Sequence, residues 1–217
     1  MKYKIGIDVG GTFTDFLLAM EDGASQIYKV LSTPDDPSTA TMNGIGEMAA
    51  DRHITVEEFL RDVTVIVHGT TVTTNAVLTY RGAKTGLLTT TGVRDALEMR
   101  RGIREEQYNN RYQNVTPLVE RYLRRPITGR LDYKGDELEP LSIQEVKEAV
   151  ELFQAEGVEA VAICFMNSFA HDHHEQAAAA LVQELMPDAY LTVSHDILPS
   201  IRFYDRVSTT VLNSYVG

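Results

Sequence analysis

Cysteine is nearly absent from this sequence of 217 residues. The single cysteine, Cys164, lies in an apolar run over residues 161–165, so a disulfide framework is excluded. This composition fits the reducing cytoplasm. A buried thiol in such a run behaves as a small apolar side chain, and we therefore predict a core position for Cys164 and not a nucleophile.

Basic side chains are also in the minority, with 20 Lys and Arg against 31 Asp and Glu and a net charge of −11. Nucleic acids and anionic membrane surfaces attract basic faces, so this balance argues against both as partners.

Long apolar runs are missing as well. No run approaches the roughly 18 residues of a membrane-spanning helix, and residues 1–4 do not lead into the apolar core of a signal peptide. We therefore expect a cytoplasmic protein without a membrane segment. The hydrophobic fraction of 43% is ordinary for a globular protein with a buried core. The length fits one large domain or two small ones.

The first third of the chain is dominated by alternating apolar and polar residues. This period of two predicts strands over residues 3–9, 13–20 and 25–32, with turns at Gly10-Gly11 and Asp22-Gly23. The chain thus opens with an antiparallel β-meander. A Rossmann or P-loop nucleotide fold is disfavoured, because it places a helix after the first glycines.

Strands and helices alternate in most of the remaining chain. A loop is expected at 34–37, and Ser38 or Thr39 is expected to cap a helix that ends near Asp51. Ser142 and Glu145 have the spacing of a capping box. Further strands are predicted over residues 63–68, 84–90, 158–165 and 190–193, and further helices over 70–80, 142–155, 172–185 and from 201 onward.

This alternation predicts an α/β fold with a mixed sheet that opens with the meander and carries helices on both faces. Residues 92–140 are rich in arginine and weak in apolar periodicity, so we interpret them as an irregular insertion. The expected organisation is a core with the glycine turn over 1–91, the insertion over 92–140, and the remainder of the α/β domain over 141–217.

The glycine turn is the most informative segment. Gly10 and Gly11 let the backbone turn tightly and approach a ligand, and successive amides of such a turn can bind a phosphate. Thr12 adds a hydroxyl donor. The carboxylate of Asp8 would repel a bare phosphate. A Mg²⁺ ion bound by this carboxylate and by phosphate oxygens removes the repulsion and fits here. Asp15 points toward the same region from the second strand. The alternative is a hairpin whose glycines serve only the turn.

The segment Asp8-x-Gly10-Gly11-Thr12-x-Thr14-Asp15 resembles the first phosphate motif of the actin and sugar-kinase superfamily. The whole chain resembles, more narrowly, the N-terminal region of the hydantoinase A/5-oxoprolinase family. The further matching segments span nearly the whole chain in the family's order: residues 68–76, 82–90, 162–169, 174–175, 194–199 and 204–213.

The resemblance implies a ribonuclease-H-like fold and an enzyme that uses ATP and Mg²⁺ to phosphorylate an oxygen of an unreactive substrate. It implies that Asp8 organises Mg²⁺ and that Asp15 supports the loop or a water molecule. It also implies phosphate contacts from four residues: Gly10, Gly11, Thr12 and Thr14.

Family members are several-fold longer than this chain. In the superfamily, ATP lies between two domains, and the second domain, with its adenosine contacts, is not found here. The resemblance therefore implies half of a nucleotide site that is inactive by itself, the rest of the A-type chain, a B-type partner subunit and an oligomer. The helical pattern that runs to Gly217 without a stop signal also suggests that the natural protein continues or that a partner receives this helix.

His68-Gly69-Thr70-Thr71 ends a predicted strand and opens a predicted helix that carries Asn75. Amides at a helix start favour an anion or a carbonyl oxygen, and His68 can hydrogen-bond a substrate or move a proton. We predict His68 as a catalytic residue and Thr70, Thr71 and Asn75 as substrate contacts. The alternative is a capped helix with a structural histidine.

His171, His173 and His174 have the residue type of metal ligands, but their spacing is not the i, i+4 of a helical pair. The favoured interpretation is a solvated helix start. If a metal binds here, imidazole and carboxylate ligands predict Zn²⁺ or Mn²⁺. Ser194-His195-Asp196 has the composition of a hydrolase triad, but we reject it, because adjacent residues of a strand point to opposite faces.

Arg101 and Arg104 are our candidates from the arginine-rich segment for binding a substrate carboxylate. The alternative is a set of surface ion pairs with the nearby glutamates.

Three functions follow from these observations. The first is the N-terminal part of an ATP-dependent cyclic-amide hydrolase of the hydantoinase/5-oxoprolinase type. The second is a subunit of an ATP-dependent acetone or acetophenone carboxylase, a branch that residues 105–112 resemble somewhat more closely. The third is a non-catalytic nucleotide-binding regulatory module. Bicarbonate dependence separates the first two, and nucleotide affinity without substrate-stimulated hydrolysis marks the third.

Overall fold

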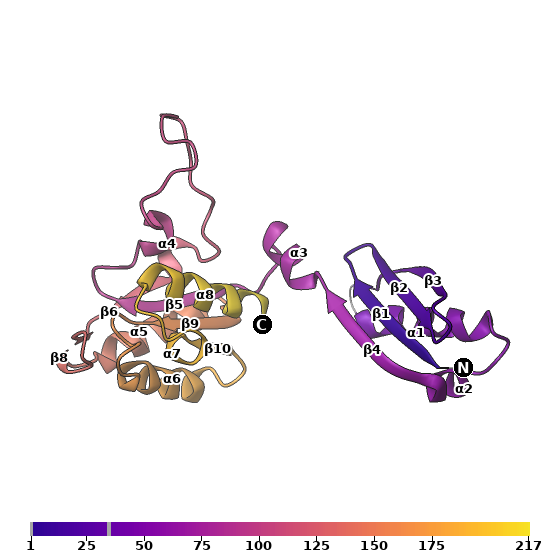
Figure 1. Cartoon of the computed structure of the whole chain (residues 1–217). Helices are drawn as coiled ribbons and strands as arrows, with labels where there is room; N and C mark the ends of the chain where they lie inside the picture. Colours follow the sequence, from indigo (N-terminus) through magenta and orange to yellow (C-terminus); the bar gives the residue numbers. More distant parts are fainter. Residues whose placement is uncertain (1, 34–35) are drawn as a thin grey trace. The chain divides into compact units, whose positions relative to one another are not determined.

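The computed structural model describes residues 2–33 and 36–217 (Figure 1). The chain forms two compact units, residues 1–81 and 82–217, each with its own sheet and its own apolar core. Of the loop expected at 34–37, Pro34 and Asp35 lie outside the described residues.

Unit 1 is built on a four-stranded sheet with the order β3-β2-β1-β4. The first three strands form the predicted antiparallel meander, and β4 runs parallel to β1. The elements of this unit are β1 (Tyr3–Val9), β2 (Phe13–Met20), β3 (Ser25–Leu31), α1 (Pro37–Ala50), α2 (Val56–Asp62), β4 (Val63–Thr70) and α3 (Val72–Leu78).

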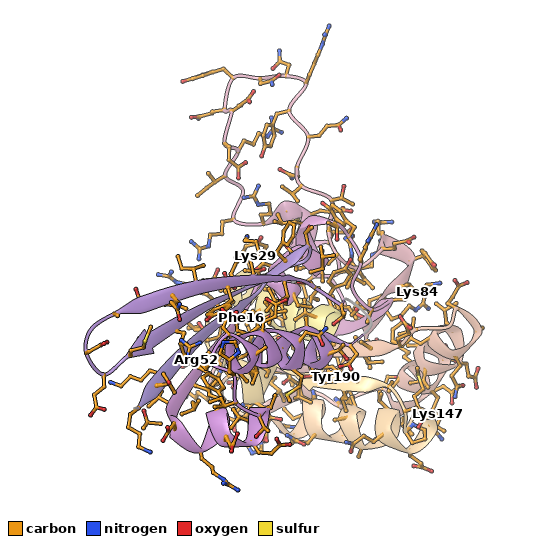
Figure 2. The ribbon with its side chains drawn as sticks, turned by 90° about the vertical axis from the view of Figure 1, so that its right-hand side faces the viewer. Phe16, Lys29, Arg52, Lys84, Lys147 and Tyr190 are labelled. Atoms are coloured by element: carbon orange, nitrogen blue, oxygen red, sulfur yellow. The ribbon has the colours of Figure 1, made fainter. Side chains whose placement is uncertain are left out.

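The core of unit 1 lies between one face of this sheet and the helices α1 and α2. Ile5, Ile7 and Val9 alternate with exposed residues along β1 and are buried in this core. Phe16, labelled in Figure 2, is 1% exposed and occupies the space beside Gly44 of α1, where a side chain would overlap its ring.

The opposite face of the unit 1 sheet is open among the residues that the structure describes. Leu17, Ile27 and Val67 lie on strands of this sheet and are 49%, 77% and 64% exposed. In unit 1, helices α1 and α2 pack on the core face of the sheet.

Unit 2 contains a parallel sheet with the order β10-β9-β5-β6 and a separate antiparallel ribbon of β7 and β8. Its strands are β5 (Thr85–Thr90), β6 (Arg124–Ile127), β7 (Arg130–Leu131), β8 (Glu137–Glu139), β9 (Ala160–Cys164) and β10 (Tyr190–Val193). Its helices are α4 (Ala96–Met99), a short 3₁₀ helix (Arg121–Leu123), α5 (Ile143–Ala155), α6 (His173–Leu185), α7 (Ser194–Ile197) and α8 (Phe203–Val216).

Helices cover both faces of the unit 2 sheet. All five residues of β9 are buried, because α5 and α6 pack on the sheet together with α8. Cys164 is fully buried at the end of β9, as predicted, and burial raises the pKa of its thiol to about 12. A thiol with this pKa stays protonated near neutral pH, so it is unsuited to a nucleophilic role.

The α/β class and the opening meander are thus confirmed, but the strands do not share the single sheet that we expected. The second sheet begins with β5, which pairs with β9 and β6 and lies before the boundary predicted after residue 91. The division between the units falls between Arg81 and Gly82. Within 92–140 the chain is irregular between α4 and the 3₁₀ helix, and the loop after α4 extends away from the unit 2 sheet in Figure 1.

Candidate functional site

The turn between β1 and β2 is shaped by hydrogen bonds to its own strand ends and to Ser32. Gly10 N donates to Phe13 O over 3.0 Å, and Ser32 N donates to Thr12 O over 2.9 Å. The Ser32 hydroxyl donates to Gly10 O over 2.7 Å and contacts the hydroxyl of buried Thr14 at 3.0 Å. These contacts fix the carbonyl groups of the turn.

The amides of the same turn remain available. Within the described ranges 2–33 and 36–217, neither Gly11 N nor Thr12 N donates a hydrogen bond to the protein. Both residues are exposed, and the Thr12 hydroxyl lies beside them. Consecutive free amides in a tight turn form an anion-binding concavity, so this turn has the donors that a phosphate requires.

The end of β4 and the start of α3 lie beside the turn. Thr71 N donates to Val9 O over 3.1 Å, and the Thr70 hydroxyl donates to the same carbonyl over 3.3 Å. Asn75 Nδ2 is 3.4 Å from the Thr71 hydroxyl, and a Cβ placed on Gly11 would lie 3.1 Å from Asn75 Nδ2. Glycine at position 11 therefore allows the turn to approach α3 closely.

These segments enclose a pocket of about 710 Å³ within unit 1. It is lined by Val9, Gly10, Gly11, Thr12, Ser32, Thr33, Pro37, Thr71, Val72, Asn75, Ala76, Thr79 and Arg81. The structure thus brings together most of the predicted phosphate and substrate contacts. Ser32, Thr33 and Arg81 also line the pocket but were not among the predicted site residues. A hydroxyl pair directly after the third strand of a meander was the available signal for the first two.

Asp8 and Asp15 face each other across β1 and β2, on the open face of the sheet. The ammonium group of Lys29, labelled in Figure 2, is 2.8 Å from Asp15 Oδ1. The carboxylate of Asp8 makes no hydrogen bond or ion pair with any described residue. Ile7 and Val9, on either side of Asp8, point to the core face of the sheet and are buried there. His68 pairs with Ile7 and therefore lies on this core face, opposite to Asp8. His68 is exposed, and the strand register separates it from Asp8 by the thickness of the sheet.

Arg101 and Arg104 belong to unit 2. Arg101 donates to both carboxylate oxygens of Asp205, with distances of 2.5 Å and 2.6 Å from Nη2. Arg104 is exposed in the irregular segment. A separate cavity of about 520 Å³ in unit 2 is lined by two other arginines, Arg94 and Arg100, together with Asp95, Phe203 and Tyr204.

A buried carboxylate organises the ends of β9 and β10 in unit 2. Glu175 Oε1 accepts from Phe165 N at 2.8 Å and from the hydroxyls of Ser168 and Ser194 at 2.6 Å, and Oε2 accepts from His195 N at 2.9 Å. Arg206 donates to the Ser168 hydroxyl over 2.7 Å.

This network corrects two of our expectations. His174 and Glu175 are 3% and 0% exposed, so the solvated helix start that we predicted is wrong for these two residues, whereas His171 and His173 are accessible to solvent. Residues 194–196 begin the short helix α7 and not a strand. The triad is still excluded, because Ser194 binds Glu175, while His195 Nδ1 contacts Ser168 O at 2.8 Å.

Comparison with known proteins gives a family match over most of the chain. The model of the hydantoinase/oxoprolinase N-terminal region matches residues 4–186. The caprolactamase alpha subunit of Pseudomonas jessenii is 42% identical, over 100% of this chain and 31% of the relative. The acetophenone carboxylase gamma subunit of Aromatoleum aromaticum is 33% identical, over 98% of this chain and 31% of the relative.

Two solved structures share the fold. The ATP-dependent caprolactamase of Pseudomonas jessenii has a TM-score of 0.87 at 42% identity, covering 98% of this chain and 31% of its own. The nucleotide-free acetone carboxylase has a TM-score of 0.88 at 26% identity, covering 99% of this chain and 32% of its own. The chain therefore spans about a third of the length of these relatives.

Proposed function

Because the chain belongs to the hydantoinase/oxoprolinase family through that family's N-terminal region, we propose that it is part of an ATP-dependent enzyme that hydrolyses cyclic amides. The observation that carries this proposal is the pair of free amides at Gly11 and Thr12 on the wall of the unit 1 pocket. The caprolactamase relative, described as ATP-dependent, supports the substrate class.

The glycine turn is the proposed phosphate site. Gly11 N, Thr12 N and the Thr12 hydroxyl donate to phosphate oxygens, while Gly10 provides the turn. Thr14 supports the phosphate site indirectly. Its buried hydroxyl contacts the Ser32 hydroxyl, which donates a hydrogen bond to Gly10 O in the turn. Fixed donors of this kind stabilise the charge that develops during phosphoryl transfer without reorganising.

Asp8 is the proposed ligand of Mg²⁺. Its carboxylate is exposed, lies two residues before the turn, and has no protein cation beside it in the described part of the chain. Two carboxylates directly opposite each other on neighbouring strands repel, and Lys29 compensates Asp15 alone. A divalent cation fits this donor set, since Mg²⁺ combines one or two carboxylates with phosphate oxygens and water.

In this reaction class, ATP phosphorylates the amide oxygen and water then opens the ring. Phosphoryl transfer depends on positioning and charge neutralisation, which are the tasks assigned to the turn and to Asp8. Thr71 and Asn75 line the same pocket and are the proposed substrate contacts, together with Thr70 and His68 at the end of β4. Arg101 and Arg104 remain proposed contacts for a substrate carboxylate.

The active protein is proposed to be longer than this chain and to work in the cytoplasm with a second subunit. The relatives are about three times as long and bear subunit names. The sheet order β3-β2-β1-β4, with an antiparallel meander and a parallel fourth strand, is compatible with a ribonuclease-H-like domain. None of the helices within residues 2–33 and 36–217 combines the length and the apolar composition of a membrane span.

The test is phosphate release from Mg-ATP by the whole natural protein with its partner subunit, in the presence of caprolactam, hydantoin, 5-oxoproline or a ketone with and without bicarbonate. Stimulation by a cyclic amide alone supports the proposal. Asp8→Asn should lower turnover at least about 100-fold, whereas Glu57→Gln on the exposed surface of α2 should leave it unchanged. Unchanged turnover of the Asp8 variant would remove the magnesium assignment.

The second candidate is an ATP-dependent ketone carboxylase. It is favoured by the likeness to the acetophenone carboxylase subunit and to the acetone carboxylase structure. Stimulation that requires both ketone and bicarbonate would establish it. Nucleotide binding without stimulation by any of these compounds would point to a regulatory module.

A further inference from the structure

Three metal-ligating side chains from two separate elements of unit 2 meet beside the β7–β8 ribbon. Glu137 is the first residue of β8, and His173 and His174 are the first two residues of α6. Glu137 Oε2 lies 2.7 Å from His174 Nε2 and 3.4 Å from His173 Nε2. The three ligand atoms lie within 4.8 Å of one another.

The hydrogen bonds around His173 leave one of its ring nitrogens facing the carboxylate. His171 Nδ1 accepts from the backbone amide of His173 over 3.3 Å, so it acts as an acceptor. It is also 3.0 Å from His173 Nδ1, and this contact requires a proton on His173 Nδ1. A neutral His173 then directs the lone pair of Nε2 toward the carboxylate of Glu137.

A lone pair and a carboxylate repel each other unless a positive charge lies between them. Either a proton or a metal ion can supply this charge. The second arrangement is the familiar one, in which a metal-bound histidine donates its other ring N–H to a neighbouring acceptor that orients the ring. His171 has this orienting position relative to His173.

The distances also suit a small divalent metal ion. Zinc binds imidazole nitrogen and carboxylate oxygen at about 2.0–2.2 Å, which places neighbouring ligand atoms of a tetrahedral site roughly 3.3 Å apart. The observed separations of 2.7 Å and 3.4 Å require a small widening of one pair. His174 is 3% exposed, whereas His173 and Glu137 are accessible, so an ion can enter from solvent.

We propose that Glu137, His173 and His174 bind one divalent transition-metal ion, of which Zn²⁺ is the best match, through Glu137 Oε and the two Nε2 atoms. Two imidazoles and one carboxylate leave a fourth position for water. The metal would tie the β7–β8 ribbon to the start of α6. A two-stranded ribbon is marginally stable by itself, so such a link stabilises the local fold.

The experiment is a Zn²⁺ titration of the 217-residue chain, freed of metal with a chelator, in competition with a chromophoric zinc indicator. We expect one Zn²⁺ per chain with a Kd of about 1 μM or tighter. Substitution of Co²⁺ should give the intense visible absorption of a tetrahedral site. The thermal midpoint of the chain should rise when Zn²⁺ is added.

Two variants test the ligands. His173→Ala should weaken Zn²⁺ binding more than about 100-fold and abolish the thermal shift, and it should fold because His173 is accessible. Glu137→Gln keeps the side-chain shape and should also lose binding. His53→Asn is the matched control, since it removes an exposed histidine of unit 1 at a positive φ of 57° that asparagine tolerates.

Binding that survives both His173→Ala and Glu137→Gln would place the ion elsewhere and overturn the proposal. Absence of Zn²⁺ binding tighter than about 100 μM would also overturn it, and would leave the cluster as a protonated histidine–carboxylate clamp between the ribbon and α6.

Discussion

At the scale of single residues, two glycines of α1 show that adding the methyl group of alanine can either lower or raise the stability of the protein. Gly44 is buried, and a Cβ at this position would overlap the ring of Phe16. Gly46 is two residues further along the same helix, and a Cβ there meets nothing within 4 Å. Helix propensity favours alanine at both positions, so packing alone distinguishes them.

We therefore predict opposite changes in the free energy of unfolding. Gly44→Ala should lower it by about 1–3 kcal/mol through overpacking against Phe16, and Gly46→Ala should raise it by about 0.5–1 kcal/mol. Urea denaturation of the two variants and of the unmodified chain measures both changes. Equal changes would show that the Phe16 ring moves freely and that the core of unit 1 is not closely packed.

Single residues also show which side-chain partners could not be predicted from the sequence. The pair Ser142 and Glu145 was predicted as a capping box, and the Ser142 hydroxyl does accept from Glu145 N. The Glu145 carboxylate, however, accepts from Thr128 N and the Thr128 hydroxyl. A residue 17 positions away competes for this side chain, and local spacing contains no information about such a partner.

At the scale of elements, the strands of the meander were predicted almost to the residue, because each alternates between a buried and an exposed face. The helix α2 and the strand β6 were not predicted. Helix α2 has seven residues, begins with a capping box of Thr55 and Glu58, and buries Phe59 alone. Strand β6 is defined by its pairing with β5 and has no alternation of its own.

The residues of the candidate site that lie together in one short motif were predicted. A residue that contacts this motif from a distant part of the sequence was not. Gly10, Gly11 and Thr12 lie in one motif. Ser32 reaches the same turn from the end of β3, 22 residues away, and holds both Gly10 O and the Thr14 hydroxyl.

Ser32→Ala should therefore weaken nucleotide binding while the sheet remains intact. Loss of one hydrogen bond to the turn costs about 0.5–1.5 kcal/mol, equivalent to a roughly 2–12-fold rise in the Kd for Mg-ATP. Calorimetry on the whole natural protein measures this change, with Ser25→Ala at the exposed start of β3 as the control. Equal affinities of the two variants would mean that Ser32 does not shape the phosphate site.

The Glu175 network gives a second prediction at this scale. Its carboxylate accepts four hydrogen bonds from the ends of β9 and β10, and the buried Arg206 joins through Ser168. Glu175→Gln replaces an acceptor oxygen by an NH₂ group and removes the negative charge to which Arg206 is linked through Ser168. We expect the free energy of unfolding of unit 2 to fall by about 2–4 kcal/mol.

Thermal unfolding monitored by circular dichroism tests this expectation. Glu184→Gln on the exposed side of α6 is the control and should change the thermal midpoint little. A stable Glu175→Gln variant would show that the two serines and the arginine satisfy one another without the carboxylate.

At the scale of the whole molecule, the open face of the unit 1 sheet is the feature that the sequence did not predict. The alternation of β2 and β3 indicates which residues face the core, but it does not show whether a second layer covers the other face. Leu17 and Ile27 are exposed on that face, as is Val67 on β4, which is an edge strand in the described residues. Large apolar patches of this kind mark surfaces that bind other protein.

Under the proposal that the natural protein is longer than this chain, as its relatives are, the further polypeptide is the candidate to cover this face and to complete the proposed nucleotide site. The 217-residue chain should then bind a fluorescent hydrophobic dye and release little phosphate from Mg-ATP. The whole natural protein should bind less dye per molecule and should turn over ATP when its substrate is present.

Leu17→Ser and Ile27→Ser in the short chain should reduce the dye signal without changing the fold, because both side chains are exposed there. In the whole protein the same changes should be destabilising, since a covered apolar side chain contributes about 1.5–3 kcal/mol. If the short chain hydrolyses ATP as fast as the whole protein, the proposal that unit 1 holds only half of the nucleotide site is wrong, whatever the dye reports about its open face.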